Sequence, residues 1–250
     1  MRKTILALIV SASAGSVSLA AQESPGVAIL ERMRKAYDGK WYNTLTFVQR
    51  TITAQPGAKP DTSIWYETVI GSRLRIDIGD PALGNGMLYT PDSAYVMRGG
   101  ALARAIPAGN PFLPLIMGVY LQPAERTARE LAAFGFDFSK TTTGTWQDAP
   151  VTIVGAAAPT DTTSAQFWVD SRNLVVRVIG NVRGTGGMAV EIDGYERAGD
   201  GWLGTRVIMS SGTRSQVEEY TDWKVGIPID PALHDLTQWK TAPHWAGRRP

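Results

Sequence analysis

The side chains suited to acid–base chemistry are few and lie late in the sequence. Both histidines, His234 and His244, fall in the last seventeen residues, and Asp235 directly follows His234. A carboxylate can orient an imidazole as a general base, but neighbours in sequence need not have side chains that meet. A hydrolase that uses His234 therefore remains an alternative, although the sequence contains neither a G-x-S-x-G nor an H-E-x-x-H motif.

The sequence offers little support for a metal site or for a covalent catalytic mechanism. The chain contains no cysteine, which excludes a thiol nucleophile, a disulfide and a cysteine-linked lipid. The separation of His234 and His244 matches no usual zinc spacing. Glu218 and Glu219 are neighbours on a predicted strand, so they point to opposite faces, and we interpret them as part of a solvated strand face. We expect no catalytic residue, no metal site and no cofactor.

The N-terminus is typical of an export signal. Arg2 and Lys3 precede the apolar run TILALIV, and small residues lead to Ser18-Leu19-Ala20, which resembles a cleavage site. Residues 1–21 are therefore predicted to be a signal peptide. No later apolar run approaches the ~20 residues needed to span a bilayer. Gln22 stands where a lipidated cysteine would be, so we expect a soluble, non-lipidated periplasmic protein.

The charge balance argues against nucleic acid as a partner. Removing Arg2 and Lys3 with the signal peptide leaves 25 minus 2, or 23, basic residues against 23 acidic ones. A small basic cluster, HWAGRRP, lies in the C-terminal tail, residues 239–250. We interpret it as a frayed, solvated terminus.

The elements that must position any site are predicted from hydrophobic periodicity. Ser24 can begin a helix whose apolar residues recur every three or four positions. The period then changes to two, and SRLRIDI puts Leu74, Ile76 and Ile78 on one face of a strand. Turns such as QPGAKPD, RGG and DSRN separate about ten or eleven strands. The sequence predicts a mainly β (α+β) antiparallel domain over residues 22–238, with a helical insert at about 110–135.

The most apolar segment of that insert is NPFLPLIMGVYLQP, residues 110–123. Asn110 can cap a helix and Pro111 can begin it, whereas Pro114 and Gly118 weaken the helix interior. Apolar side chains surround the helix on nearly all sides, so one sheet face cannot bury them all. Two interpretations remain: a plug of ordinary core, or a helical lid over an apolar cavity.

The order of these motifs resembles the LolA-like outer-membrane lipoprotein-sorting carriers along most of the chain after the signal peptide. IWYETVIGSRLRIDI is similar to the family's Trp-containing strand, basic turn and second strand. GMLYTPDSAYVMRGGALARAI is similar to its next two strands, and NPFLPLIMG to its hydrophobic helix. FWVDSRNLVVRVIGN resembles its signature hairpin, and VEEYTDWKVGIPIDPALHDL its closing strand and proline-containing tail.

The resemblance implies a strongly curved antiparallel half-barrel covered by helices around a hydrophobic cavity. It implies a non-catalytic carrier of lipid or lipoprotein acyl chains that takes part in lipoprotein sorting to the outer membrane. An inner-membrane releasing complex and an outer-membrane acceptor would be its partners, and we expect a monomer. The family's functional arginine falls at the basic turn, where Arg73 is the candidate for a polar contact and Arg75 is the less well-matched alternative. An envelope stress sensor or interaction module, similar to the sigma-factor regulator RseB, is the alternative function on this scaffold.

Ligand-binding candidates for the cavity and lid are the large apolar side chains of the matched strands and helix. Only one of two neighbouring strand residues can face inward, so Phe167 and Trp168 cannot both line a cavity. Ordinary core packing is the alternative for each candidate. The candidates are Trp65, Leu74, Ile76, Phe112, Leu115, Ile116, Phe167 and Trp168.

Overall fold

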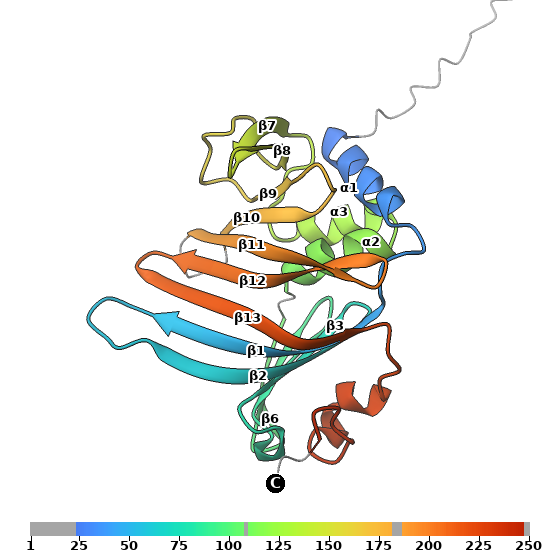
Figure 1. Cartoon of the computed structure of the whole chain (residues 1–250), viewed down its shortest axis with the longest axis vertical. Helices are drawn as coiled ribbons and strands as arrows, with labels where there is room; N and C mark the ends of the chain where they lie inside the picture. The colour runs from blue at the N-terminus through green and yellow to red at the C-terminus, as the bar shows by residue number, and fades with distance from the viewer. Residues whose placement is uncertain (1–23, 108–109, 182–186, 248–250) are drawn as a thin grey trace, which may run out of the picture.

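One antiparallel sheet organises the molecule. The computed structural model describes residues 24–107, 110–181 and 187–247, and the predicted signal peptide lies outside them. Within these ranges, thirteen strands form a single open sheet in the order β6-β5-β4-β3-β2-β1-β13-β12-β11-β10-β9-β8-β7 (Figure 1). The strands are β1 (Thr44–Ala54), β2 (Asp61–Ile70), β3 (Arg73–Ile78), β4 (Gly86–Tyr89), β5 (Ala94–Arg98), β6 (Ala101–Ile106), β7 (Thr141–Trp146), β8 (Ala149–Val154), β9 (Gln166–Val169), β10 (Val175–Asn181), β11 (Gly187–Ala198), β12 (Gly201–Ser211) and β13 (Arg214–Val225).

The sheet consists of two meanders joined along one seam. Strands β1 to β6 pair with their neighbours in sequence, as do β7 to β13. The seam is the antiparallel pairing of β1 with β13, which places Thr51 opposite Glu218 and Gln49 opposite Tyr220. The sheet does not close, because β6 and β7 lie at its two edges.

The predicted number of strands, ten or eleven, is too low. Part of the difference lies in the hairpin of β7 and β8, whose turn is formed by Gln147 and Asp148. Both residues adopt positive φ values, 48° and 63°, as a type I′ turn requires at its two central positions. Glycine and asparagine are the usual residues there, so the sequence QD gives no hairpin signal.

Three helices cover part of one face of the sheet. They are α1 (Pro25–Ala36), α2 (Val119–Leu121) and α3 (Ala124–Ala132), and Figure 1 shows them grouped together. Helix α1 begins after Ser24, as predicted, and buries Leu30 and Met33. None of the helices in the described ranges is long and apolar enough to cross a membrane.

The close approach of α1 to the chain after α3 depends on a glycine. The Gly26 amide donates a hydrogen bond to the Phe138 carbonyl at 2.9 Å. A Cβ atom at position 26 would lie only 2.7 Å from that carbonyl oxygen. Glycine therefore lets the helix begin directly against this backbone.

The apolar segment of the insert is helical but irregular. Asn110 caps its start, because its side-chain oxygen accepts the Phe112 amide at 2.9 Å. A wide π-helical turn, η2 (Pro114–Gly118), follows and leads into α2. Proline at the first position of η2 removes one amide donor, and π turns are often found at functional sites. A helical segment is therefore present where the sequence predicted one, and the irregular turn within it is bounded by Pro114 and Gly118, the two residues expected to weaken the helix.

The two faces of this segment enter two different hydrophobic clusters. Leu115, Val119 and Tyr120 join the cluster under α1 and α3, here called the helix cluster, which also contains Phe167. Leu113 and Met117 join the cluster on the first meander, here called the meander cluster, which is built on the residues that follow. They are Tyr42, Leu45, Phe47, Val69, Leu74 and Ile76, together with Ala198 on β11 and Leu203 on β12.

Short 3-10 turns complete the structure. They are η1 (Pro81–Leu83), η3 (Pro231–His234) and η4 (Leu236–Gln238). Figure 1 shows the red C-terminal segment at the other end of the sheet from the three helices. It contacts β3.

Candidate functional site: an apolar cavity with a polar strip

A cavity of about 410 Å³, partly open to solvent, lies between the sheet and the helical insert. Its volume falls within the range of about 300–1,000 Å³ that is usual for small-molecule sites. Residues of the helix cluster and of the meander cluster both line it, and most are apolar or aromatic. The wall from the sheet includes Leu45, Phe47, Trp65, Val69, Leu74, Ile76, Met87, Val190, Ile192, Val207 and Met209, and the wall from the insert includes Phe112, Leu113, Leu115, Ile116 and Met117.

Strand alternation explains which residues reach the cavity. On β2, Trp65, Glu67 and Val69 share the cavity face, and on β3 Leu74 and Ile76 do so. Successive side chains of a strand point to opposite faces, so the residues between them face the other side of the sheet. The faces predicted from SRLRIDI agree with this arrangement.

Six of the eight predicted ligand-binding residues line the cavity. Because strand β2, strand β3 and the insert each contribute to the six, the cavity wall joins segments that are distant in sequence. The six are Trp65, Leu74, Ile76, Phe112, Leu115 and Ile116.

The other two predicted residues do not reach the cavity. Phe167 is fully buried in the helix cluster, with its ring centroid 5.9 Å from that of Phe136. Trp168 points to the opposite face of β9, where its ring makes an edge contact with Trp146 and lies beneath the Arg177 guanidinium. The residues after α3 fill the space above Phe167, which the pattern of β9 alone could not indicate.

A strip of polar residues crosses the cavity wall and was missed by the sequence analysis. Glu67 lies on β2, Gln49 on β1, and Glu218 and Tyr220 on β13, and all four line the cavity. Glu218 is 5% exposed, so its interpretation as part of a solvated face is wrong. Its neighbour Glu219 does face solvent. A carboxylate that alternates with Trp65 and Val69 on β2 was the signal available in the sequence.

Burial raises the pKa of both glutamates. For Glu67 the pKa lies well above its ordinary value, because burial disfavours the charge and Glu218 adds like-charge repulsion. Burial also raises the pKa of Glu218, while hydrogen bonds from Tyr220 and Gln216 act in the opposite direction. The Tyr220 hydroxyl donates to Glu218 Oε2 at 2.7 Å, and Gln216 Nε2 donates to Glu218 Oε1 at 2.6 Å.

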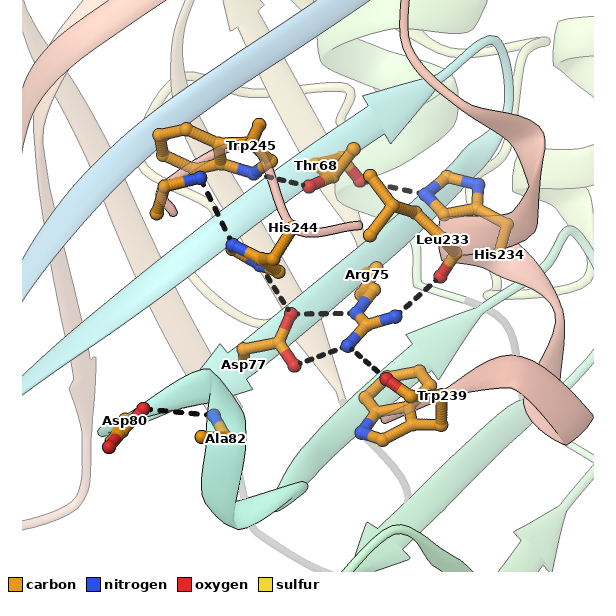
Figure 2. Close-up of polar contacts among 11 residues, drawn as sticks. Thr68, Arg75, Asp77, Asp80, Ala82, Leu233, His234, Trp239, His244 and Trp245 are labelled. Carbon is orange, nitrogen blue, oxygen red and sulfur yellow. Dashed lines mark hydrogen bonds and ion pairs between the residues drawn. The ribbon is translucent and has the colours of Figure 1, made fainter. Parts of the chain in front are cut away.

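Neither candidate arginine faces the cavity. Arg73 is exposed, whereas Arg75 is buried on the opposite face of β3. Figure 2 shows the Arg75 guanidinium in a fork with Asp77, and both of its hydrogen bonds to that carboxylate measure 2.7 Å. Arg75 also donates to the carbonyls of Leu233 and Trp239, each at 2.8 Å. Arg75 therefore fastens the C-terminal segment to β3.

The two histidines also hold the C-terminal segment against β2 and β3. His234 Nε2 lies 3.1 Å from the Thr68 carbonyl oxygen, which can only accept, so Nε2 carries the hydrogen. His244 Nδ1 accepts the Ala246 amide, and its Nε2 lies 3.2 Å from Asp77 Oδ2 (Figure 2). In the described ranges, no three histidine or carboxylate side chains gather as a metal site requires.

The tail is packed where the sequence predicted fraying. Trp245 Nε1 donates to the Thr68 hydroxyl at 2.8 Å, and the rings of His244 and Trp245 stack. The prediction of a solvated terminus is therefore wrong for these two residues. Their partners, Asp77 on β3 and Thr68 on β2, are buried residues that lie far away in the sequence.

The comparisons with known proteins concern the backbone. No family model matches the sequence, and no curated protein matches it. Among solved structures, a LolA superfamily protein from Nitrosomonas europaea superposes with a TM-score of 0.54 at 13% identity, covering 82% of this chain and 96% of its own. A putative outer-membrane lipoprotein-sorting protein domain from Vibrio parahaemolyticus has a TM-score of 0.58 at 12% identity, covering 86% of this chain and 98% of its own. The chain has a LolA-like fold.

The LolA-like fold confirms the resemblance found in the order of the sequence motifs. A DUF1329 family protein from Desulfovibrio piger has a similar backbone, with a TM-score of 0.57 at 13% identity over 85% of this chain and 98% of its own. At such identities the likeness concerns the fold, and function depends on the site. The cavity and its polar strip are features of this chain's own residues.

Proposed function

We propose that this protein is a periplasmic carrier that binds the acyl chain of a lipid or lipoprotein in the cavity between the sheet and the insert. The observation that carries the proposal is the 410 Å³ cavity with predominantly apolar and aromatic walls. Large apolar pockets with a few polar groups are the usual sites for apolar ligands. The carrier acts without covalent chemistry, as a curved half-barrel under a helical lid.

The energetics suit an acyl ligand. Burying about fourteen methylenes at ~0.8 kcal/mol each stabilises the complex by roughly 11 kcal/mol before the losses of association. That value is comparable with the free energy that holds one acyl chain in a membrane. A chain could therefore leave a bilayer only for a similarly dry, apolar cavity.

The irregular insert supports the idea of a lid. Its π-helical turn contributes Leu115, Ile116 and Met117 to the cavity wall. A segment with Pro114 and Gly118 in its interior forms fewer and weaker helical hydrogen bonds, so it can open at a lower free-energy cost than a regular helix. Opening would admit the ligand.

The proposal extends to location and partners. A signal peptide over residues 1–21 would deliver the protein to the periplasm, where it would act as a non-lipidated monomer in lipoprotein sorting to the outer membrane. An inner-membrane releasing complex would load it and an outer-membrane acceptor would receive the cargo. Residues 22–238 would form the carrier domain, and residues 239–250 its tail.

The test is native mass spectrometry of the exported protein, followed by organic extraction and lipid analysis of the same sample. A stoichiometric acylated adduct is the expected result. Protein that emerges empty from cells rich in lipoprotein, and that also fails to bind added acyl probes, would overturn the proposal. A protein partner recovered without lipid would instead favour the envelope stress sensor.

A pair of variants tests the cavity itself. Ile116 is partly buried and lines the cavity, whereas Leu121, on α2, is 38% exposed and does not line it. Ile116→Asp places a charge in the cavity and should abolish binding of an acyl probe. Leu121→Asp adds the same charge to the same insert and should leave binding unchanged. Equal binding by the two variants would contradict the assignment of the cavity.

A further inference from the structure

The polar strip in the cavity has a strong charge asymmetry. Two carboxyl groups, Glu67 and Glu218, line the cavity, and no lysine, arginine or histidine is among the described residues that line it. Water-excluding walls strengthen the field of such groups, because the local dielectric constant is low. The cavity therefore disfavours anions and favours cations.

Glu67 is a buried carboxyl that still needs a partner. Its side chain is 5% exposed and lines the cavity. No hydrogen bond or ion pair joins it to another side chain in the described part of the chain, whereas Glu218 accepts bonds on both oxygens. A buried carboxyl without a partner lowers the stability of the fold, and such groups are found where they serve binding or catalysis.

The two carboxyl groups lie on the two strands that pair with β1. Glu67 lies opposite Phe47 on β1, and Glu218 lies opposite Thr51 on the other edge of the same strand. Gln49 lies between these two positions on β1 and lines the cavity as well. A ligand group at Gln49 would therefore have one carboxyl group on either side.

The surrounding aromatic rings also suit a positive charge. Trp65 shares the cavity face of β2 with Glu67, and Tyr220 shares that of β13 with Glu218. The faces of aromatic rings attract cations, most strongly where water is excluded. The remaining residues of the cavity wall are mostly apolar, which suits the tail of an amphiphile.

We propose that the cavity selects amphiphiles with a cationic amine, whose ammonium group lies between Glu67 and Glu218 while the alkyl chain lies against the apolar walls. This inference rests on the proposed carrier function and adds the chemistry of the headgroup. An ammonium group donates three hydrogen bonds, and its charge favours the ionised form of both carboxyl groups, against the burial that raises their pKa. A hydroxyl group could donate one bond but would leave the carboxyl groups uncompensated, and a carboxylate would be repelled.

The test compares three ligands with the same tail and different headgroups: dodecylamine, dodecanol and dodecanoate. Displacement of a neutral fluorescent dye measures their affinities, below the concentration at which each forms micelles. A hydrogen bond to a charged group contributes about 1.4 kcal/mol more than a neutral one, so dodecylamine should bind about tenfold more tightly than dodecanol. Dodecanoate should bind more weakly than both.

The outcomes separate this inference from the carrier function. Equal affinities for amine and alcohol, or tightest binding of dodecanoate, would overturn the amine selectivity and leave the carrier function standing. Failure of the dye and all three ligands to bind would overturn the carrier function itself.

A charge-matched pair of variants locates the effect. Glu67→Gln removes the proposed counter-charge and breaks no hydrogen bond in the described structure. It should lose the tenfold preference for dodecylamine over dodecanol. Glu219→Gln removes the same charge from the solvent side of β13 and should keep the preference. Selectivity that survives in Glu67→Gln would overturn the inference.

Discussion

The guanidinium carbon of Arg75 lies 3.8 Å from the ring centroid of Trp239. This contact joins β3 to a segment that lies far away in the sequence, and Trp239 itself is 1% exposed. Together with the Asp77 fork and the two carbonyl acceptors, it encloses the arginine completely. Of the two arginines that the family resemblance suggested for ligand contact, Arg75 has a structural role in this chain.

Removal of Arg75 should severely destabilise the protein. Arg75→Ala leaves Asp77 buried without its partner and frees the C-terminal segment, so the free energy of unfolding should fall by about 3–5 kcal/mol. Urea unfolding followed by tryptophan fluorescence measures the change. Arg73→Ala removes an exposed arginine from the same strand and should cost less than about 0.5 kcal/mol. Similar losses for both variants would contradict this role.

Glu67→Gln should stabilise the protein, increasingly so as the pH rises. The pKa of Glu67 is raised in the fold above 4.5, its ordinary value, by burial and then by Glu218. The stability contributed by the protonated Glu67 side chain is therefore complete when the pH lies below its pKa in the unfolded chain. It is lost as the pH rises through its pKa in the folded protein. At neutral pH the gain should be roughly 1–3 kcal/mol. Melting temperatures of both proteins across the pH range measure it, and a difference that does not grow with pH would contradict the assignment.

His234 should make the fold sensitive to acid. Burial lowers the pKa of His234 to about 4 from 6.5, so its contribution is present above 6.5 and is lost as the pH falls through about 4. Between these two pH values the chain binds one proton on unfolding, so the free energy of unfolding falls by about 1.4 kcal/mol for each unit by which the pH is lowered. His234→Gln can still donate to the Thr68 carbonyl and should reduce the slope by that amount. Denaturant titrations at several pH values measure the slope, and equal slopes would refute the prediction.

Gly86 should tolerate no side chain. A Cβ atom there would overlap the Ile76 carbonyl oxygen and lie 3.1 Å from Trp239 Cζ2. Gly86→Ala should therefore cost about 1–3 kcal/mol by overpacking. Gly180, on β10, has nothing within 4 Å of the same position, so Gly180→Ala serves as the matched control and should be neutral or slightly stabilising. Thermal unfolding of the two variants compares them, and equal melting temperatures would show that β3 and β4 can separate.

Local pattern predicted the faces of strands well, because alternation is a property of a few neighbouring residues. Leu74 and Ile76 face the cavity and Arg75 faces away, as SRLRIDI indicated. The insert was also predictable, since Asn110 and Pro114 act on their own helix.

The segments that cover each face of the sheet could not be predicted from the local sequence pattern. The partners of Arg75 come from residues 233 and 239, and those of Glu218 include Tyr220, which reads as an ordinary aromatic strand residue. Glu67 and Glu218 come together only through the pairing of β1 with both β2 and β13. No spacing in the sequence expresses that relationship.

The seam between β1 and β13 also determines how the chain must fold. Each meander can form from hairpins between sequence neighbours, but Arg50 meets Glu219 across 169 residues, in a surface ion pair of 2.7 Å. Closing so long a loop is the entropic step that makes proteins of high contact order fold slowly. Until it closes, each meander presents an unpaired strand edge that can pair with another chain. The cavity, whose two carboxyl groups lie on either side of this seam, comes into existence only with that late step, so ligand binding reports completed folding.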